Sequence, residues 1–330
     1  MFGKKAKDLA ADLILDKWEE EIKFIKKNNN KIGLYIHIPY CQSACYFCDC
    51  FSIPSSREKA DKYTNGLIKE IRRFASIFNG VGFDTLYFGG GTPSILSENA
   101  LDELLKNLHK YFNFKNAHSS FEGCPKTLNK NKLEILKKYN INRLTIGAQS
   151  LDKKVLGSNN RSFTPRKSIK ELVEKCKKLG ILVNLELICG LKDQSQTSFL
   201  NDVVQIVDMK PNQIHLYYFE HNPATLVWHD GTYKGPTVKE RISWKNQGLE
   251  ILERAGYGAF PFSGLADRFD AINVQIYNNR VHNASLLGIG DGATSKINNN
   301  FMYGSVFDGD KFIYKKLLKR FIKYSEIFNK

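Results

Sequence analysis

The sequence predicts an α/β protein built on a parallel sheet, with the architecture of a partial TIM barrel, (β/α)6. Two observations lead to this fold. Short apolar, β-branched runs recur along the first two thirds of the chain, and the segments between them place apolar residues at spacings of three and four. These are the periods of buried strands and amphipathic helices. Six strand-helix units in succession, joined by right-handed crossovers, roll a parallel sheet into an open or closed barrel.

Each strand-helix unit is visible in the letters. The expected strands are "GLYIHIP" (33–39), "TLYFGGG" (85–91), "SSFEGCP" (119–125), "RLTIGAQS" (143–150), "LVNLELICG" (182–190) and "QIHLYYFE" (213–220). The expected helices between them are "EKADKYTNGLIKEIRRFASIF" (58–78), "SENALDELLKNLHKYF" (97–112), "NKNKLEILKKY" (129–139), "SIKELVEKCKKLG" (168–180) and "QTSFLNDVVQIVD" (196–208).

Both ends of the chain depart from this rhythm. Residues 1–32 are expected to form an N-terminal helical extension, residues 33–223 the partial barrel, and residues 224–330 a reduced C-terminal region that completes and covers it. This last region is predicted to be short and mostly helical, with one helix near 237–255. A basic amphipathic helix is expected from "DKFIYKKLLKRFIKYSEIF" (310–328), packed on the barrel or binding a partner.

Composition narrows the class of protein. The chain has 330 residues, 42% of them hydrophobic, which is enough to bury a large core. Its net charge of +15 comes from lysines dispersed along helix-like segments, so we expect no nucleic-acid binding. No run approaches the roughly 20 apolar residues of a membrane span, and the N-terminus lacks a signal-peptide core. A cytoplasmic protein is therefore expected.

Four of the seven cysteines crowd into "YIHIPYCQSACYFCDCF" (35–51). Cys41, Cys45 and Cys48 have the spacing C-x3-C-x2-C, and three thiolates on one loop can hold three corners of a [4Fe-4S] cube, with one iron left open. Zinc is the alternative, but it usually recruits a second cysteine pair, which the sequence lacks. Cys50 is a possible fourth ligand, although the one-residue gap to Cys48 makes common ligation awkward. The remaining thiols are expected to be inert: Cys124, Cys176 and Cys189.

Other chemically distinctive residues stand where predicted strands end. In a barrel of this kind, the carboxyl ends of the strands face the active site. These positions carry the cysteines after the first strand and then Gly89, Gly90, Gly91, Thr92, Glu122, Gln149 and Glu186. The sequence therefore predicts one active site at this end of the barrel.

Four motifs together resemble a known family. "YIHIPYC" with the cysteine spacing, "YFGGGTPS", "INRLTIGAQSLD" and "LICGLKDQS" occur in the order found in the radical S-adenosylmethionine (SAM) superfamily. The resemblance is to its oxygen-independent coproporphyrinogen III oxidase family, with the haem-chaperone and class C methylase relatives. It runs from about Gly33 to Pro223 and, more weakly, to Lys296. The fold it implies is the radical SAM core, a partial (β/α)6 barrel.

The resemblance also implies cofactors and roles for particular residues. In that family SAM chelates the open iron, and an electron from the cluster cleaves SAM to methionine and a 5′-deoxyadenosyl radical that abstracts hydrogen from the substrate. The metal ligands it implies are Cys41, Cys45 and Cys48. The SAM-binding residues it implies are Phe47 at the adenine, Gly89, Gly90, Gly91 and Thr92 at the amino-acid end, Glu122 at the ribose, and Gln149, Arg161 and Glu186.

Tyr35 and His37 are the candidate catalytic residues. They alternate with Ile36 and Ile38 and therefore share one face of a strand. The resemblance places both near the cluster. The alternative is that His37 is a hydrogen-bonded core residue.

The resemblance implies an enzyme that acts on a tetrapyrrole or similar flat aromatic substrate, as coproporphyrinogen III oxidases do. A class C radical SAM methyltransferase and a haem chaperone with a regulatory cluster are the alternatives. The sequence leaves open whether a second SAM binds. The expected reductant is an acidic flavodoxin or ferredoxin, which a positively charged chain would attract.

Overall fold

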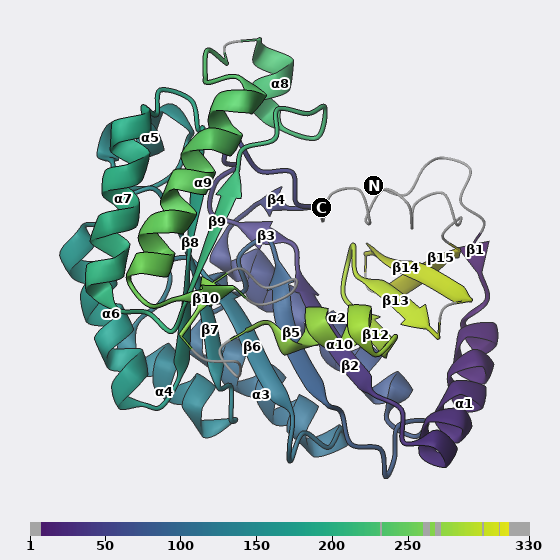
Figure 1. Cartoon of the computed structure of the whole chain (residues 1–330). Coiled ribbons are helices and arrows are strands. Elements are labelled where there is room, and N and C mark those ends of the chain that lie inside the picture. Colours follow the sequence, from purple (N-terminus) through teal and green to yellow (C-terminus); the bar gives the residue numbers. More distant parts are fainter. Residues whose placement is uncertain are drawn as a thin grey trace. The chain divides into compact units, whose positions relative to one another are not determined.

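The computed structural model describes residues 8–231, 233–259, 265–267, 272–298, 300–309 and 311–316 (Figure 1). The chain divides into two compact units. Unit one comprises Met1–Tyr40, Ser56–Ser120 and Val274–Lys330. Unit two comprises Cys41–Ser55 and Phe121–Asn273. Strand β6 (His118–Gly123) contains one boundary between them, after Ser120.

Unit one is built on parallel strands that continue into an antiparallel meander. Strand β2 (Ile32–Ile38) pairs in parallel with β5 (Thr85–Gly90) on one side and with β12 (Ser285–Ile289) on the other. The register aligns Leu287, Leu34 and Leu86 in one row, and all three side chains are fully buried. Antiparallel strands extend this sheet beyond β12: β13 (Thr294–Ile297), β14 (Phe301–Asp308), β15 (Lys311–Lys316) and β1 (Asp8–Leu9).

The helices of unit one follow their apolar periodicity. They are α1 (Ala11–Asn28), α2 (Arg57–Phe74), α3 (Glu98–Tyr111) and α10 (Val274–Val281), with a 3-10 turn at Pro93–Ile95. Helix α2 begins at an N-cap, Ser56, whose side chain accepts from the backbone N–H of Lys59. Buried Trp18 anchors α1, because its indole N–H donates to the hydroxyl of Tyr303 on β14 over 2.8 Å.

Unit two is built on three parallel strands, β7 (Arg143–Gln149), β8 (Leu182–Cys189) and β9 (Gln213–Tyr218). Two short strands follow β9 antiparallel, β11 (Leu265–Ala266) and β10 (Gly258–Ala259). Its helices are α4 (Lys130–Lys138), α5 (Lys153–Ser158), α6 (Arg166–Lys178), α7 (Gln196–Met209), α8 (Leu226–Asp230) and α9 (Val238–Arg254). Helices α6, α7 and α9 pack along the strands on one side (Figure 1).

The strand period places two kinds of side chain on the two faces of this sheet. Apolar residues such as Ile146, Leu185 and Ile214 are fully buried. The alternate positions carry polar side chains, and the register brings Thr145 beside Asn184 and Glu186 beside His215. One face of unit two is therefore core, and the other is lined with groups that can bind and react.

The predicted α/β alternation is confirmed. All six expected strands form, with ends within about two residues of the predicted ones, and each of the five expected helices has a counterpart. Helix α5 was not predicted. None of the described helices combines the length and apolar content that crossing a membrane requires. The three-part division at residues 32 and 223 stays a prediction.

The C-terminal region needs a correction. It was expected to be mostly helical, yet the described part of residues 285–316 forms the strands β12 to β15. "KFIYKK", assigned to a basic helix, is strand β15, in which Phe312 and Tyr314 are buried while Lys311 is exposed and Lys315 is partly exposed. Period-2 alternation with an antiparallel partner prevailed over a helical pattern. The rest of the predicted helix, 317–328, lies outside the described residues.

Candidate functional site

The cysteine loop (residues 41–50) lies in unit two and begins in the two-residue strand β3 (Tyr40–Cys41), which pairs with β4 (Ile53–Pro54). The backbone N–H of Ser55 donates to the carbonyl of Cys41 over 2.8 Å, and that of Cys48 donates to the carbonyl of Cys45 over 3.2 Å. Cys45 is buried, whereas Cys41 and Cys48 are partly exposed. None of the three forms a disulfide bond in the described part of the chain, and all three lie on this one loop.

A second segment of unit two contacts this loop. The backbone N–H of Tyr46 donates to the carbonyl of Asn159 over 3.0 Å, and the Asn160 side-chain amide donates to the carbonyl of Ala44 over 2.8 Å. The Arg161 guanidinium lies 3.6 Å from the Cys45 sulfur. Burial raises the pKa of the Cys45 thiol, and the positive charge of Arg161 opposes that rise.

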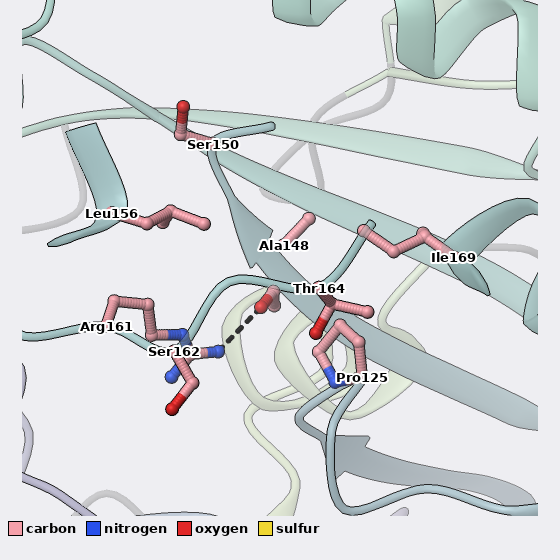
Figure 2. A pocket seen from close by; sticks show the side chains of 9 residues that line it. Pro125, Ala148, Ser150, Leu156, Arg161, Ser162, Thr164 and Ile169 are labelled. Carbon is pink, nitrogen blue, oxygen red and sulfur yellow. Dashed lines mark hydrogen bonds between the residues drawn. The ribbon is translucent and has the colours of Figure 1, made fainter. Parts of the chain in front are cut away.

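Arg161 is oriented by the backbone of β7. Its Nη2 donates to the carbonyl of Gly147 over 2.6 Å, the bond drawn as a dashed line in Figure 2. Beside it lies a hollow of about 190 Å³, counting space open to solvent, lined by Pro125, Ala148 and Ile169 among others (Figure 2). Arg161 was predicted to bind SAM. The structure adds a cysteine sulfur to its contacts.

Cys50 interacts with one member of the predicted ligand set. It shares a hydrogen bond with Cys48, which lowers the pKa of the Cys48 thiol to about 7. Its own sulfur also lies 3.9 Å from a carboxylate oxygen of Asp49. A group that favours the thiolate of Cys48 would assist metal ligation without ligating the metal itself.

Two acidic residues of the prediction lie within electrostatic reach of each other. Burial, and then the nearby Glu122 carboxylate, raise the pKa of Glu186 to about 7. The Tyr217 hydroxyl lies 3.4 Å and the Asn184 amide nitrogen 3.5 Å from the same oxygen of Glu186.

Gln149 has two unusual features at the end of β7. Its backbone is left-handed, with φ of 68°, which is costly for a residue other than glycine. Its side-chain oxygen is buried and has no hydrogen-bond partner among the described residues. A buried, unpaired acceptor in a native protein calls for a partner, and a ligand that donates protons, such as an ammonium group, would supply one.

The other predicted residues lie in unit one. The Tyr35 hydroxyl is 2.9 Å from Nδ1 of His37, and the His37 side chain is only 5% exposed. The register of β2 and β5 aligns His37 with Gly89. Gly90 has φ of 114°, and a Cβ there would lie 2.6 Å from Nε2 of His37. The His37 ring therefore packs directly against Gly90, and a side chain at position 90 would clash with it.

Gly91 and Thr92 continue this packing. A Cβ on Gly91 would lie 2.9 Å from the carbonyl oxygens of Pro39 and Tyr40. The backbone N–H groups of Gly91 and Thr92 donate over 2.9 Å to the carbonyls of Ile38 and Tyr40. The predicted reason for the glycines was close approach to SAM, and the structure supplies an additional one, close approach of the chain to itself.

The structure thus places the predicted residues in two groups. Within unit two it joins the cysteine loop to Arg161 and sets Glu122 near Glu186, with Phe47 partly exposed on the loop. Within unit one it joins Tyr35, His37 and Gly90. Asn159, Asn160 and Tyr217 were missed. The "NNR" string that ends in Arg161 was a usable signal for the two asparagines.

Cys124 was expected to be inert. Its thiol is close enough for its charge to affect both Cys45 and Arg161. That expectation overlooked its position just after β6, at the same strand ends as the other candidate residues.

Comparison with known proteins identifies the family. The family described as Radical SAM superfamily matches residues 35–203, just over half of the chain. The chain belongs to the Radical SAM superfamily. A haem chaperone, HemW, of Buchnera aphidicola (subsp. Acyrthosiphon pisum, strain APS) is 30% identical over 270 residues, which cover 81% of this chain and 70% of the relative.

One further relative and one solved structure are similar to the chain. An oxygen-independent coproporphyrinogen III oxidase of Salmonella typhimurium is 29% identical over 287 residues, covering 82% of this chain and 62% of the relative. The solved structure of Escherichia coli coproporphyrinogen III oxidase, HemN, superposes with a TM-score of 0.77 at 22% identity, covering 98% of this chain and 79% of that one. This likeness confirms the α/β radical SAM fold. The chain spans less than two thirds of the length of the Salmonella relative.

Radical SAM enzymes use a [4Fe-4S] cluster and SAM, and membership assigns these cofactors to the chain. The residues present fit them. Three free thiols occupy one loop, and the buried oxygen of Gln149 awaits a donor. Among the described residues, no three His, Cys, Asp or Glu side chains converge on a single metal ion. The irons of a cube are separate centres, so its thiolates need not converge on one point.

Proposed function

We propose that the chain is a radical SAM enzyme that reductively cleaves SAM at a [4Fe-4S] cluster and acts on a tetrapyrrole or similar flat aromatic substrate, in the manner of coproporphyrinogen III oxidases. The observation that carries the proposal is the loop of three free thiols, Cys41, Cys45 and Cys48, in a chain of this superfamily. The likeness to a coproporphyrinogen III oxidase over 82% of the chain supports the substrate class.

When bound, the cluster supplies one electron that breaks a carbon-sulfur bond of SAM, and the resulting 5′-deoxyadenosyl radical removes a hydrogen atom from the substrate. The three cysteines hold the cluster as thiolates. Cys50, hydrogen-bonded to Cys48, favours the thiolate of that residue. Burial of Cys45 keeps water from one ligand.

SAM-binding roles are assigned residue by residue within each unit. Gln149 presents its unpaired oxygen to the SAM ammonium group. Arg161 has five N–H donors, and its contacts with Gly147 and Cys45 leave donors for the SAM carboxylate. Glu122 accepts from the ribose hydroxyls. Phe47 packs on the adenine, and Gly89 to Gly91 and Thr92 receive the amino-acid end.

Glu186 and the Tyr35-His37 pair are assigned to proton handling and orientation. Glu186 keeps its proposed SAM-binding role, and with a pKa near 7 its carboxyl can gain or lose a proton near neutral pH. Tyr35 and His37 share one hydrogen bond, which orients the imidazole ring.

Anaerobic reconstitution tests this proposal. The protein, loaded with iron and sulfide and reduced with dithionite, should convert SAM to 5′-deoxyadenosine, and coproporphyrinogen III should increase the rate and be decarboxylated. The Cys45→Ala variant should release no 5′-deoxyadenosine. The matched control Cys176→Ala, which removes a buried thiol distant in sequence from the cysteine loop, should still release it. Reconstituted wild type that binds no SAM would overturn the proposal. Transfer of a labelled methyl group would instead indicate the methyltransferase.

A haem chaperone is the second candidate, because a protein of that description is 30% identical over most of this chain. Haem titration separates the two. Stoichiometric haem binding by the reconstituted protein, without 5′-deoxyadenosine release, would favour the chaperone. We further propose an acidic flavodoxin or ferredoxin as the physiological reductant, since the net charge of +15 attracts such partners.

A further inference from the structure

Residues 159–161, "NNR", contact the cysteine loop at three successive points, although they form no part of the cysteine spacing. The backbone N–H of Tyr46 donates to the carbonyl of Asn159 over 3.0 Å. The side-chain amide of Asn160 donates to the carbonyl of Ala44 over 2.8 Å. The guanidinium of Arg161 lies 3.6 Å from the sulfur of Cys45. We call residues 159–161 the NNR segment.

The NNR segment is itself firmly held. The Asn159 side chain is 1% exposed and donates to the carbonyls of Val155, over 2.7 Å, and Lys192, over 3.0 Å. The backbone N–H of Arg161 donates to the carbonyl of Leu156 over 2.9 Å. The segment is therefore fixed to the end of α5 and to the turn after β8, independently of the cysteine loop.

Asn160 has the conformation that this role requires. Its φ is 51°, in the left-handed region, where asparagine is among the few residues tolerated at moderate cost. That conformation ends the turn after α5 and leaves the side-chain amide on the carbonyl of Ala44. From helix α8, the backbone N–H of Val227 donates to the carbonyl of Tyr46 over 3.1 Å. The middle of the loop is thus bonded to two other segments of unit two.

Arg161 brings a permanent positive charge to the cluster ligand. Its bond to the Gly147 carbonyl fixes the guanidinium plane (Figure 2), and its Nη1 faces the sulfur of Cys45, a side chain only 8% exposed. Opposite charges interact more strongly when water is excluded. Hydrogen bonds to sulfur and net charge are two of the features that set the potential of an iron-sulfur cluster.

We propose that the NNR segment is a positioning element for the cluster: Asn159 and Asn160 hold the cysteine loop in its binding conformation, and Arg161 stabilises the added negative charge of the reduced cluster through Cys45. The inference rests on the proposed ligation by Cys41, Cys45 and Cys48. The electron comes from dithionite or the flavodoxin-like reductant, and Arg161 makes its acceptance more favourable.

The Arg161 part is tested by a redox titration followed by electron paramagnetic resonance in the absence of SAM, so that loss of SAM contacts has no influence. Arg161→Gln should disfavour the reduced cluster by about tenfold, a fall in midpoint potential of about 59 mV for one electron. Arg161→Lys, which keeps the charge, should recover most of it. Arg166→Gln removes an exposed arginine of the same unit and should cause no shift. An unchanged potential in Arg161→Gln would overturn this part.

The asparagine part is tested by the rate at which a chelator removes iron from the reconstituted protein. Asn160→Gly keeps the left-handed backbone but loses the amide, and we expect severalfold faster iron loss. The matched control is Asn140→Gly, at another left-handed asparagine of unit two with φ of 53°. Asn160→Asp, a near-isostere that cannot donate to Ala44, should behave like Asn160→Gly.

Equal iron loss from wild type and both Asn160 variants would overturn the holding role. The tests are also separable from the proposed function. If wild type holds a cluster with the expected response to both sets of variants yet never cleaves SAM, the NNR segment keeps its role and the proposed enzyme activity fails.

Discussion

The two units satisfy their polar candidate residues in different ways. In unit one, Tyr35 and His37 are bonded to each other, and the imidazole is buried on Gly90. In unit two, the Gln149 oxygen is buried without a partner among the described residues, and Glu186 carries a carboxyl whose pKa is displaced upward. The Tyr35 and His37 side chains thus bond to each other within unit one, whereas Gln149 and Glu186 of unit two keep groups that can take up a ligand or a proton.

This difference separates two effects that a substitution can have. A change at the contact between His37 and Gly90 should act first on the stability of the fold, because these two residues pack directly against each other. A change in the cysteine loop or at Glu186 should act first on ligands or protons. Stability and cofactor binding are therefore expected to respond to different units.

The largest expected effect is loss of the cluster. Replacing Cys45 with alanine removes a thiolate that the proposed cube needs, so anaerobic reconstitution should yield almost no iron-sulfur absorbance and little bound iron. The apoprotein should still unfold cooperatively, because one small buried thiol contributes only about 1 kcal/mol to stability. Iron and sulfide analysis, with a thermal melt of the apoprotein, measures both.

The control for that prediction is Cys50→Ala. Cys50 is exposed and interacts with Cys48 without being assigned as a ligand, so this variant should keep its cluster. A cluster missing from Cys50→Ala, or present in Cys45→Ala, would contradict the ligand assignment.

Gly90→Ala should give the largest loss of stability in unit one. The new Cβ would lie 2.6 Å from the His37 ring, on a backbone whose φ of 114° disfavours side chains. Strain and overpacking together cost about 2 to 4 kcal/mol. Urea unfolding of the apoprotein measures the change in the free energy of unfolding. Gly157→Ala, with no neighbour within 4 Å of its Cβ, is the matched control and should be nearly neutral. Equal stability of the two variants would remove the contrast between the units.

Glu186 predicts a pH dependence in unit two. Its pKa is about 7 in the folded chain against an ordinary value of 4.5, so the folded state favours the protonated carboxyl. That stabilisation is complete below about pH 4.5 and is lost as the pH rises through 7. Relative to Glu186→Gln, wild type should therefore lose about 1 to 3 kcal/mol of unfolding free energy between pH 5 and pH 8. Urea unfolding of both apoproteins across this range measures it, and parallel curves would show that Glu186 is ionised throughout.

The sequence was sufficient for the repeating part of the fold. Strands such as β8 and helices such as α2 carry apolar residues at regular spacings, and this spacing determines which face of each element is buried. The strand β15 was missed because its six residues satisfy both a helical and an alternating pattern, and only the partner strand β14 decides between them. Pairing with a distant segment is not visible in a local window.

The candidate site divides in the same way. The placement of three cysteines on one loop and of Glu186 in a strand could be predicted, because both follow from the local sequence. The contact of Asn160 with Ala44 spans 116 positions and depends on one left-handed residue. The role of Gly90 beneath His37 likewise depends on the register of β2 and β5. Such contacts follow from tertiary packing and leave no local signal.

The smallest expected effect concerns the reductant, and it distinguishes docking on unit two from docking on unit one. Helix α5 leads directly into the NNR segment and exposes Lys153 and Lys154, so it carries positive charge close in sequence to residues that contact the cysteine loop. We expect Lys153→Glu/Lys154→Glu to slow reduction by an acidic flavodoxin a few-fold at low salt, and this difference should vanish at high salt because ions screen exposed charges. Stopped-flow reduction of the reconstituted protein measures both. The matched pair on α1, Lys23→Glu/Lys27→Glu, makes the same charge change in unit one and should alter the rate less. Equal slowing by both pairs would mean that the reductant responds to net charge alone, and a wild-type rate independent of salt would argue against electrostatic docking altogether.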